Sequence, residues 1–177
     1  MDSKTPDLEM IRKNEKEEIK KNEMQLEFLA DSINEAFART VVAAFVTPLN
    51  PTLEELSDIK TAVSEAVTNA IIHAYDEEYL PQEGTGEDKR RVYIHCLIEG
   101  DVLHVEIWDK GKGIENIERA MEPLFTTKPQ MDRSGMGFAF MEAFMDDLEV
   151  ISEIGFGTTI FMKKKIGITS WLENEES

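Results

Sequence analysis

The sequence predicts an α+β protein, a two-layer α/β sandwich in which helices cover one face of a mixed, mostly antiparallel sheet. Residues 92–109 alternate apolar and polar side chains around a turn at 99–101, which is typical of a hairpin. A second alternating pair covers 148–153 and 158–165. Amphipathic stretches lie before and between these hairpins, and they predict helices that pack on the sheet.

The first elements of the domain are one strand and one helix. Alternating apolar residues from Met24 to Phe28 are typical of a half-buried strand. The next stretch, 31–46, has helical periodicity, and Asp31 or Ser32 would cap its N-terminus.

A longer helix is predicted over 51–75, after prolines that end the preceding one. Thr52 would cap it, and Glu55 stands three residues later, as in a capping box. Alanines, valines and isoleucines form its apolar face. Residues 117–137 are expected to be irregular, and a short helix is predicted over 138–147.

The packed domain is predicted to span 22–165. Residues 1–21 are polar and charge-mixed, with too few apolar side chains to bury, and they predict a mobile extension. Residues 166–177 would form a short tail.

Composition narrows the class of protein. The 177 residues include 19 basic and 36 acidic side chains, for a net charge of −17. Such a surface repels phosphates, so direct binding of nucleic acid is not expected; the acidity suits a partner with basic patches, or it serves solubility alone. No run approaches the roughly 18 apolar residues of a membrane span, and the single Cys96 cannot form an internal disulfide. These features predict a cytoplasmic protein.

One stripe of polar residues interrupts the apolar helix over 51–75. Glu65, Asn69 and His73 follow at four-residue steps and therefore share one face. This face either meets water or lines a site. Zinc is a poor fit because Asn is a weak ligand. An Asn carbonyl can hold magnesium, and Glu65 could then orient or deprotonate a nucleophile.

Two glycine-rich segments are candidate ligand contacts. In "DKGKGI", Asp109 stands at a strand end, and Gly111 and Gly113 would let a ligand approach closely. A carboxylate there can accept a hydrogen bond from an exocyclic amine such as that of adenine. The alternative is a plain turn.

The second segment, "RSGMGF", directly precedes a helix. Gly135 and Gly137 would present backbone N–H groups to a phosphate, and Arg133 could contact its terminal oxygens. Residues 122–132 before it would be a lid or a plain surface loop. In "GTT", the Thr158 hydroxyl could help to hold adenine.

Taken in order, these four motifs are more specific than any one of them. They resemble the ATP-binding superfamily of DNA gyrase, the heat-shock-ninety chaperones, sensor histidine kinases and mismatch-repair ATPases. "EAVTNAIIHAY" is similar to its N box, "DKGKGI" and "RSGMGF" to its two glycine boxes, and "GTT" to its final motif. The resemblance covers about 24–165 and implies the histidine-kinase-like ATPase fold.

A narrower resemblance is carried by "NEAFAR", "SEAVTNAIIHAY", "PLFTTKP" and "RSGMGFAFME". These segments resemble the anti-sigma F factor family of endospore-forming bacteria. The resemblance implies a homodimeric protein serine kinase that holds the sporulation sigma factor F inactive and phosphorylates its anti-anti-sigma antagonist. ADP or ATP occupancy would select the partner. The alternatives are a general-stress-type anti-sigma kinase and a nucleotide-dependent sigma-binding module without significant kinase activity.

The resemblance also implies roles for individual residues. Glu65 would be the catalytic base, and Arg39 would dock protein partners. The residues implied to bind ATP or ADP and its Mg²⁺ are Asn69 (also the metal ligand), Asp109, Gly111, Gly113, Arg133 (at the γ-phosphate), Gly135, Gly137 and Thr158.

Overall fold

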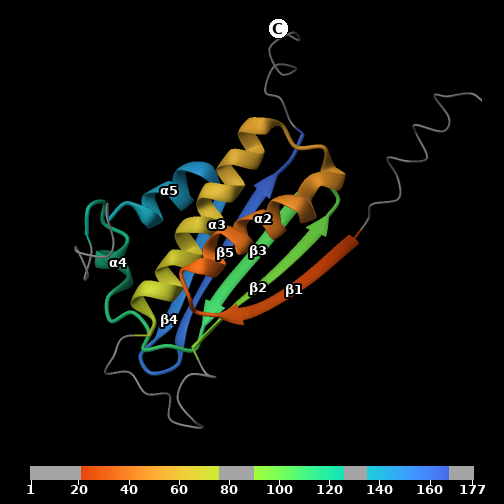
Figure 1. The fold of residues 1–177 in the computed structure, drawn as a ribbon. Coiled ribbons are helices and arrows are strands. Elements are labelled where there is room, and N and C mark those ends of the chain that lie inside the picture. Colours follow the sequence, from red (N-terminus) through yellow and green to blue (C-terminus); the bar gives the residue numbers. More distant parts are fainter. Residues whose placement is uncertain (1–20, 76–89, 126–134, 168–177) are drawn as a thin grey trace, which may run out of the picture.

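The computed structural model describes residues 21–75, 90–125 and 135–167, which form a sheet and a layer of helices (Figure 1). The elements in chain order are β1 (Lys21–Leu29), α2 (Ile33–Val46), a 3-10 turn (Thr47–Leu49), α3 (Leu53–His73), β2 (Arg91–Glu99), β3 (Val102–Asp109), α4 (Ile117–Ala120), α5 (Gly137–Phe144), β4 (Asp147–Glu153) and β5 (Gly157–Lys165).

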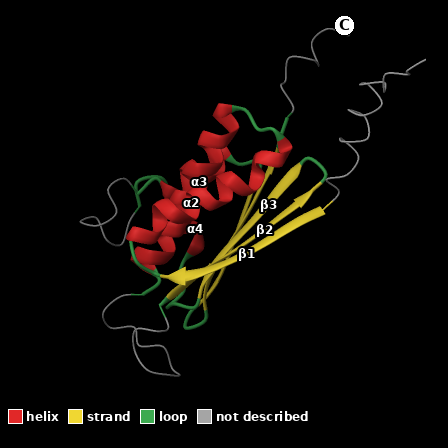
Figure 2. Ribbon diagram, turned by 45° about the vertical axis from the view of Figure 1, so that its right-hand side comes forward, coloured by secondary structure: helices red, strands yellow, loops and turns green. Residues whose placement is uncertain are grey.

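The sheet has the strand order β1-β2-β3-β5-β4. Each of its four strand pairings in the described residues is antiparallel. Figure 2 shows the helices on one face of this sheet. The predicted two-layer α+β architecture is therefore confirmed.

Apolar rows on the strands form the floor of the core. On β2, Val92, Ile94, Cys96 and Ile98 are fully buried. The matching row on β3 is Leu103, Val105, Ile107 and Asp109. Because alternate residues of a strand face the same side, the Asp109 carboxylate lies on the helix-covered face, at the end of an apolar row.

The long helix α3 lies at the centre of the helical layer, and it packs against both α2 and α5. Its fully buried face includes Ile59, Ala62, Val63, Ala66 and Val67. Glu65, Asn69 and His73 are half-buried. The polar stripe predicted from the four-residue spacing is thus partly sequestered rather than turned to water.

Three details differ from the expected boundaries. The first strand begins at Lys21 rather than at Met24. A short helix, α4, interrupts the segment that was expected to be irregular, with the Asn116 side chain accepting a bond from its third residue. At the other end, Ile166 lies beyond the predicted domain but is 3% exposed and packs in the core, and its backbone N–H donates to Asp101 O at 2.8 Å.

The N-terminus of α3 carries the predicted capping box. Thr52 Oγ1 accepts from Glu55 N–H at 3.1 Å, and Glu55 Oε2 accepts from Thr52 N–H at 2.6 Å. Two backbone donors of the first turn are thereby satisfied. Ser32, at the start of α2, makes no side-chain cap; Asp31 Oδ1 accepts from Ile33 N–H instead, at 3.0 Å.

We expect Thr52→Ala to lower the free energy of unfolding by about 1 kcal/mol, because it removes the side-chain acceptor of the cap. Urea denaturation followed by circular dichroism measures this change. Thr52→Ser, which keeps the hydroxyl, is the control and should unfold close to the wild type. Equal denaturation midpoints for Thr52→Ala and wild type would contradict the stabilising role of the cap.

Candidate functional site

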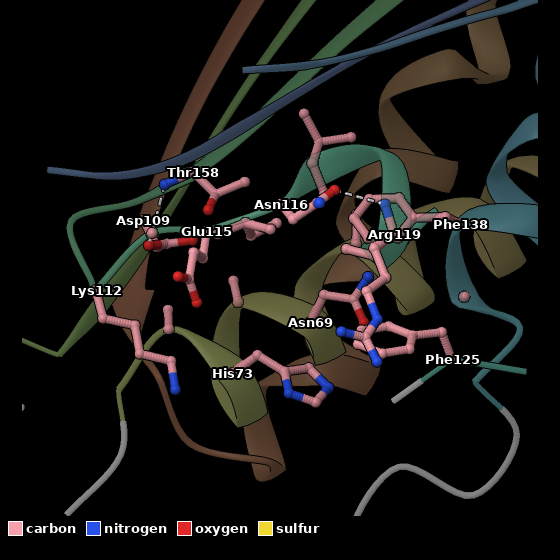
Figure 3. A pocket seen from close by; sticks show the side chains of 18 of the residues that line it. Asn69, His73, Asp109, Lys112, Glu115, Asn116, Arg119, Phe125, Phe138 and Thr158 are labelled. Carbon is pink, nitrogen blue, oxygen red and sulfur yellow. Dashed lines mark hydrogen bonds between the residues drawn. The ribbon is translucent and has the colours of Figure 1, made fainter. Parts of the chain in front are cut away.

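A cavity of about 550 Å³ lies between α3, the end of β3 and the N-terminus of α5 (Figure 3). Six of the residues predicted from the motifs line it together. They come from four separate parts of the chain and are Asn69, Asp109, Gly113, Gly135, Gly137 and Thr158.

The Glu65 side chain lies at the boundary of this cavity. A Cβ atom on Gly137 would lie 3.1 Å from Glu65 Oε2 and 3.4 Å from the amide of Asn69, so both side chains pack beside the first residue of α5. Glu65 lines a second hollow, between α2 and α3, which also contains Arg39. Asn69 lines the cavity and Glu65 lines the neighbouring hollow, and the two side chains come together beside Gly137.

Asp109 is the buried carboxylate of the cavity, with an exposed fraction of 6%. Its Oδ1 accepts from Gly111 N–H at 2.8 Å and from Thr158 N–H at 3.3 Å. Burial raises the pKa of Asp109 to about 6, against the lowering effect of these two bonds. Within the described residues both bonds end on Oδ1, so Oδ2 is the oxygen that can accept from a ligand.

Two glycines let the corner after β3 fold tightly. A Cβ atom on Gly111 would lie 2.3 Å from Ala74 O, at the end of α3. Gly113 has a φ of +78°, which favours glycine. Gly111 is buried and does not line the cavity, so its contribution is the close packing of the corner against α3.

Two hydroxyl groups hold this corner through hydrogen bonds. Tyr75 Oη donates to Arg91 O at 2.7 Å and accepts from Lys110 N–H at 3.0 Å, and burial raises the pKa of Tyr75 to about 12. Ser152 Oγ accepts from Ile114 N–H at 2.8 Å and lies 2.9 Å from Thr158 Oγ1.

Neither hydroxyl was recognised from the sequence as part of the site. Tyr75 was visible as the last residue of the N box, but its role depends on contacts with two other segments. Ser152 carries no local signal, because it is an ordinary strand residue until β4 is placed beside β5.

The remaining wall of the cavity comes from α4 and its surroundings. Asn116 caps α4, since its Oδ1 accepts from Arg119 N–H at 2.8 Å. Arg119 and Phe125 also line the cavity, as do His73 and Lys112. The one feature of the sequence that could have predicted α4 is Asn116, a residue type that commonly caps helices.

One predicted residue lies away from the cavity, and another is not described by the structure. Arg39 is on α2, where it pairs with Glu35 at 3.5 Å and has a side chain that is 40% exposed. Arg133 lies outside the described residues. Among the residues that are described, no group of three or more His, Cys, Asp or Glu side chains could hold a metal ion. In the same residues, no helix is long and apolar enough to cross a bilayer.

Residues 28–164 match the model of the histidine kinase-like ATPase domain family. An anti-sigma F factor of Anoxybacillus flavithermus is 54% identical over 146 residues, which are 82% of this chain and 94% of the relative. An anti-sigma F factor of Clostridium acetobutylicum is 55% identical over 148 residues, which are 83% of this chain and 96% of the relative. The chain belongs to the anti-sigma F factor family.

A solved structure supports the fold of this anti-sigma F factor family member. The RsbU and RsbW domains of a Mycobacterium tuberculosis protein match it with a TM-score of 0.51 at 19% identity. The match covers 82% of this chain and 32% of the other. The family and the ATPase fold predicted from the motifs are confirmed, and an ATPase domain binds a nucleotide.

We expect the preference of this anti-sigma F factor family member for ADP over inosine diphosphate to decrease as the pH falls below about 6. A proton on Asp109 would occupy Oδ2 and compete with the amine of adenine, which inosine lacks. The ionised fraction falls about tenfold for each pH unit below the pKa, so the affinity ratio should fall about tenfold by about pH 5.

Titration calorimetry at about pH 7.5 and about pH 5 measures this ratio. Inosine diphosphate is the matched control because its phosphates titrate like those of ADP. A ratio that stays constant over this range would show that Asp109 does not meet the amine.

Proposed function

We propose that this protein binds sigma factor F and holds it inactive, and that it uses ATP to phosphorylate a serine on an anti-anti-sigma antagonist. One observation carries the catalytic part. Glu65 and Asn69 stand one turn apart on α3, with one side chain in the groove that contains Arg39 and the other in the nucleotide cavity.

The nucleotide would lie in the cavity in one direction. Adenine would lie against Asp109 and Thr158, with its amine donating to Asp109 Oδ2. The phosphates would then extend toward Asn69 and the start of α5, where Gly135 and Gly137 line the cavity. Backbone N–H groups at a helix N-terminus attract phosphate, which supports this orientation.

Magnesium fits the site as a companion of the nucleotide. Mg²⁺ keeps much of its water and is commonly held by one or two protein oxygens together with substrate phosphates. The Asn69 carbonyl oxygen is such a ligand, and the described residues contain no larger acidic cage. The bound cation would neutralise charge on the phosphates.

Glu65 would act as the base toward the acceptor serine. A serine hydroxyl in the groove would give its proton to the Glu65 carboxylate while its oxygen bonds to the γ-phosphorus. The bond from that phosphorus to the bridging β–γ oxygen would break, and ADP would leave. The position of Glu65 beside Gly137 supports this role, because Gly137 also lines the cavity and the carboxylate would therefore lie close to the phosphates.

The groove between α2 and α3 would receive the protein partners. Arg39 is half-exposed at its edge, and apolar side chains such as Leu53 and Leu56 lie farther along it. An acidic group of the partner would pair with Arg39. The homodimer, the cytoplasmic location and the contact of Arg133 with the γ-phosphate stay predictions of the sequence resemblance.

We expect Glu65→Gln to bind ADP like the wild type and to transfer phosphate at least about 100-fold more slowly, because the amide cannot accept the serine proton. Transfer of radiolabelled phosphate from ATP to the purified antagonist measures the rate. An undiminished rate would exclude Glu65 as the base. If the wild type itself transfers no phosphate in the presence of magnesium, the protein is a nucleotide-dependent sigma-binding module without kinase activity.

We expect Arg39→Glu to weaken binding of the sigma factor by more than about tenfold, because a reversed charge opposes the acidic group that Arg39 would meet. ATP affinity should not change, since Arg39 lies outside the nucleotide cavity. Surface plasmon resonance measures both interactions. Lys165→Glu reverses a charge at the far end of β5 and is the control; an equal loss in both variants would remove the specific role of Arg39.

A further inference from the structure

Arg119, on α4, is an unusual cation in this acidic protein. The chain has a net charge of −17, yet Arg119 makes no ion pair with any residue of the described segments. Its side chain lines the nucleotide cavity instead. A guanidinium that reaches into a cavity without a carboxylate partner can receive an anionic ligand.

Two contacts hold Arg119 in this position. The Asn116 side chain accepts from Arg119 N–H at 2.8 Å and thereby fixes the first turn of α4. The guanidinium carbon lies 4.8 Å from the centroid of the Phe125 ring. Such stacking supports the guanidinium from one face and leaves its N–H edges for hydrogen bonds.

The place of Arg119 in the cavity indicates which part of a ligand it meets. In Figure 3, Asp109 and Thr158 lie at one end of the cavity, whereas Arg119 and Phe125 lie at the other, on the side of Asn69. A nucleotide whose base meets Asp109 would therefore direct its phosphates toward Arg119.

We propose that Arg119 binds the terminal phosphates of a nucleoside diphosphate or triphosphate through the N–H groups of its guanidinium. The inference rests on the nucleotide orientation proposed above and adds a side-chain ligand to it. Gly137, the first residue of α5, lines the same cavity, so the phosphates would meet the charge of Arg119 together with the helix N-terminus.

The test compares ATP, ADP and AMP as ligands of wild type and Arg119→Gln by titration calorimetry with magnesium. A charge-assisted hydrogen bond is strong, so affinity for ATP and ADP should fall about tenfold to 100-fold. The affinity for AMP should fall much less, because AMP lacks the terminal phosphates. Arg119→Lys keeps the charge and should recover part of the loss.

Two further variants separate the phosphate contact from indirect effects. Lys165→Gln removes the same charge from the far end of β5 and should bind all three nucleotides like the wild type. Phe125→Leu keeps Arg119 but removes the aromatic ring that supports it. This variant should lower the affinity for ADP more than the affinity for AMP. Urea denaturation confirms that each variant is folded.

Three results would overturn the proposal: unchanged ADP affinity in Arg119→Gln, equal losses for ATP, ADP and AMP, or an equal loss in Lys165→Gln. An equal loss in Lys165→Gln would indicate that Arg119 acts only through the overall charge of the protein. Tighter sigma-factor binding by wild type than by Arg119→Gln, with equal nucleotide affinities, would assign Arg119 to the partner instead. If the wild type binds no adenine nucleotide at all, the proposed nucleotide function fails together with this inference.

Discussion

The buried Asp109 carboxylate is the constraint on which the rest of the site depends. A carboxylate at the end of an apolar row is costly unless its oxygens are hydrogen-bonded. Gly111 from the following corner and Thr158 from β5 satisfy one oxygen, which ties the corner to the neighbouring strand. Among the residues that the structure describes, nothing donates to the second oxygen, so a ligand can use it. The raised pKa of Asp109 reflects this incomplete solvation.

Helix α3 lines both the cavity and the groove to which the proposed function is assigned. Its four-residue spacing places Asn69 in the nucleotide cavity and Glu65 in the groove beside α2, and Gly137 of α5 packs against both side chains. The Ser64 hydroxyl also donates to Glu35, the partner of Arg39, which joins α3 to α2.

Sequence reasoning predicted the strands, the longer helices and six of the residues that line the cavity. It missed helix α4 and the hydroxyl groups that hold the corner after β3. Apolar periodicity found every long helix and strand to within a few residues, because burial of one face is a local property. The sequence did not predict roles for Tyr75, Ser152 and Arg119, because these roles depend on contacts between segments that are distant in the chain. Ser152 meets Ile114 across 38 residues, and α4 was hidden in a segment without periodicity.

The amino-acid sequence alone determined the two-layer fold, the polar stripe on the long helix and the four motifs that indicate the family, since each is written in consecutive residues. The tertiary structure decided which hollow each stripe residue lines and which backbone groups surround Asp109. Its contact with Thr158 spans 49 residues and exists because β3 and β5 are neighbours in the sheet. Strand order depends on the packing of the whole chain, so local spacing cannot specify it.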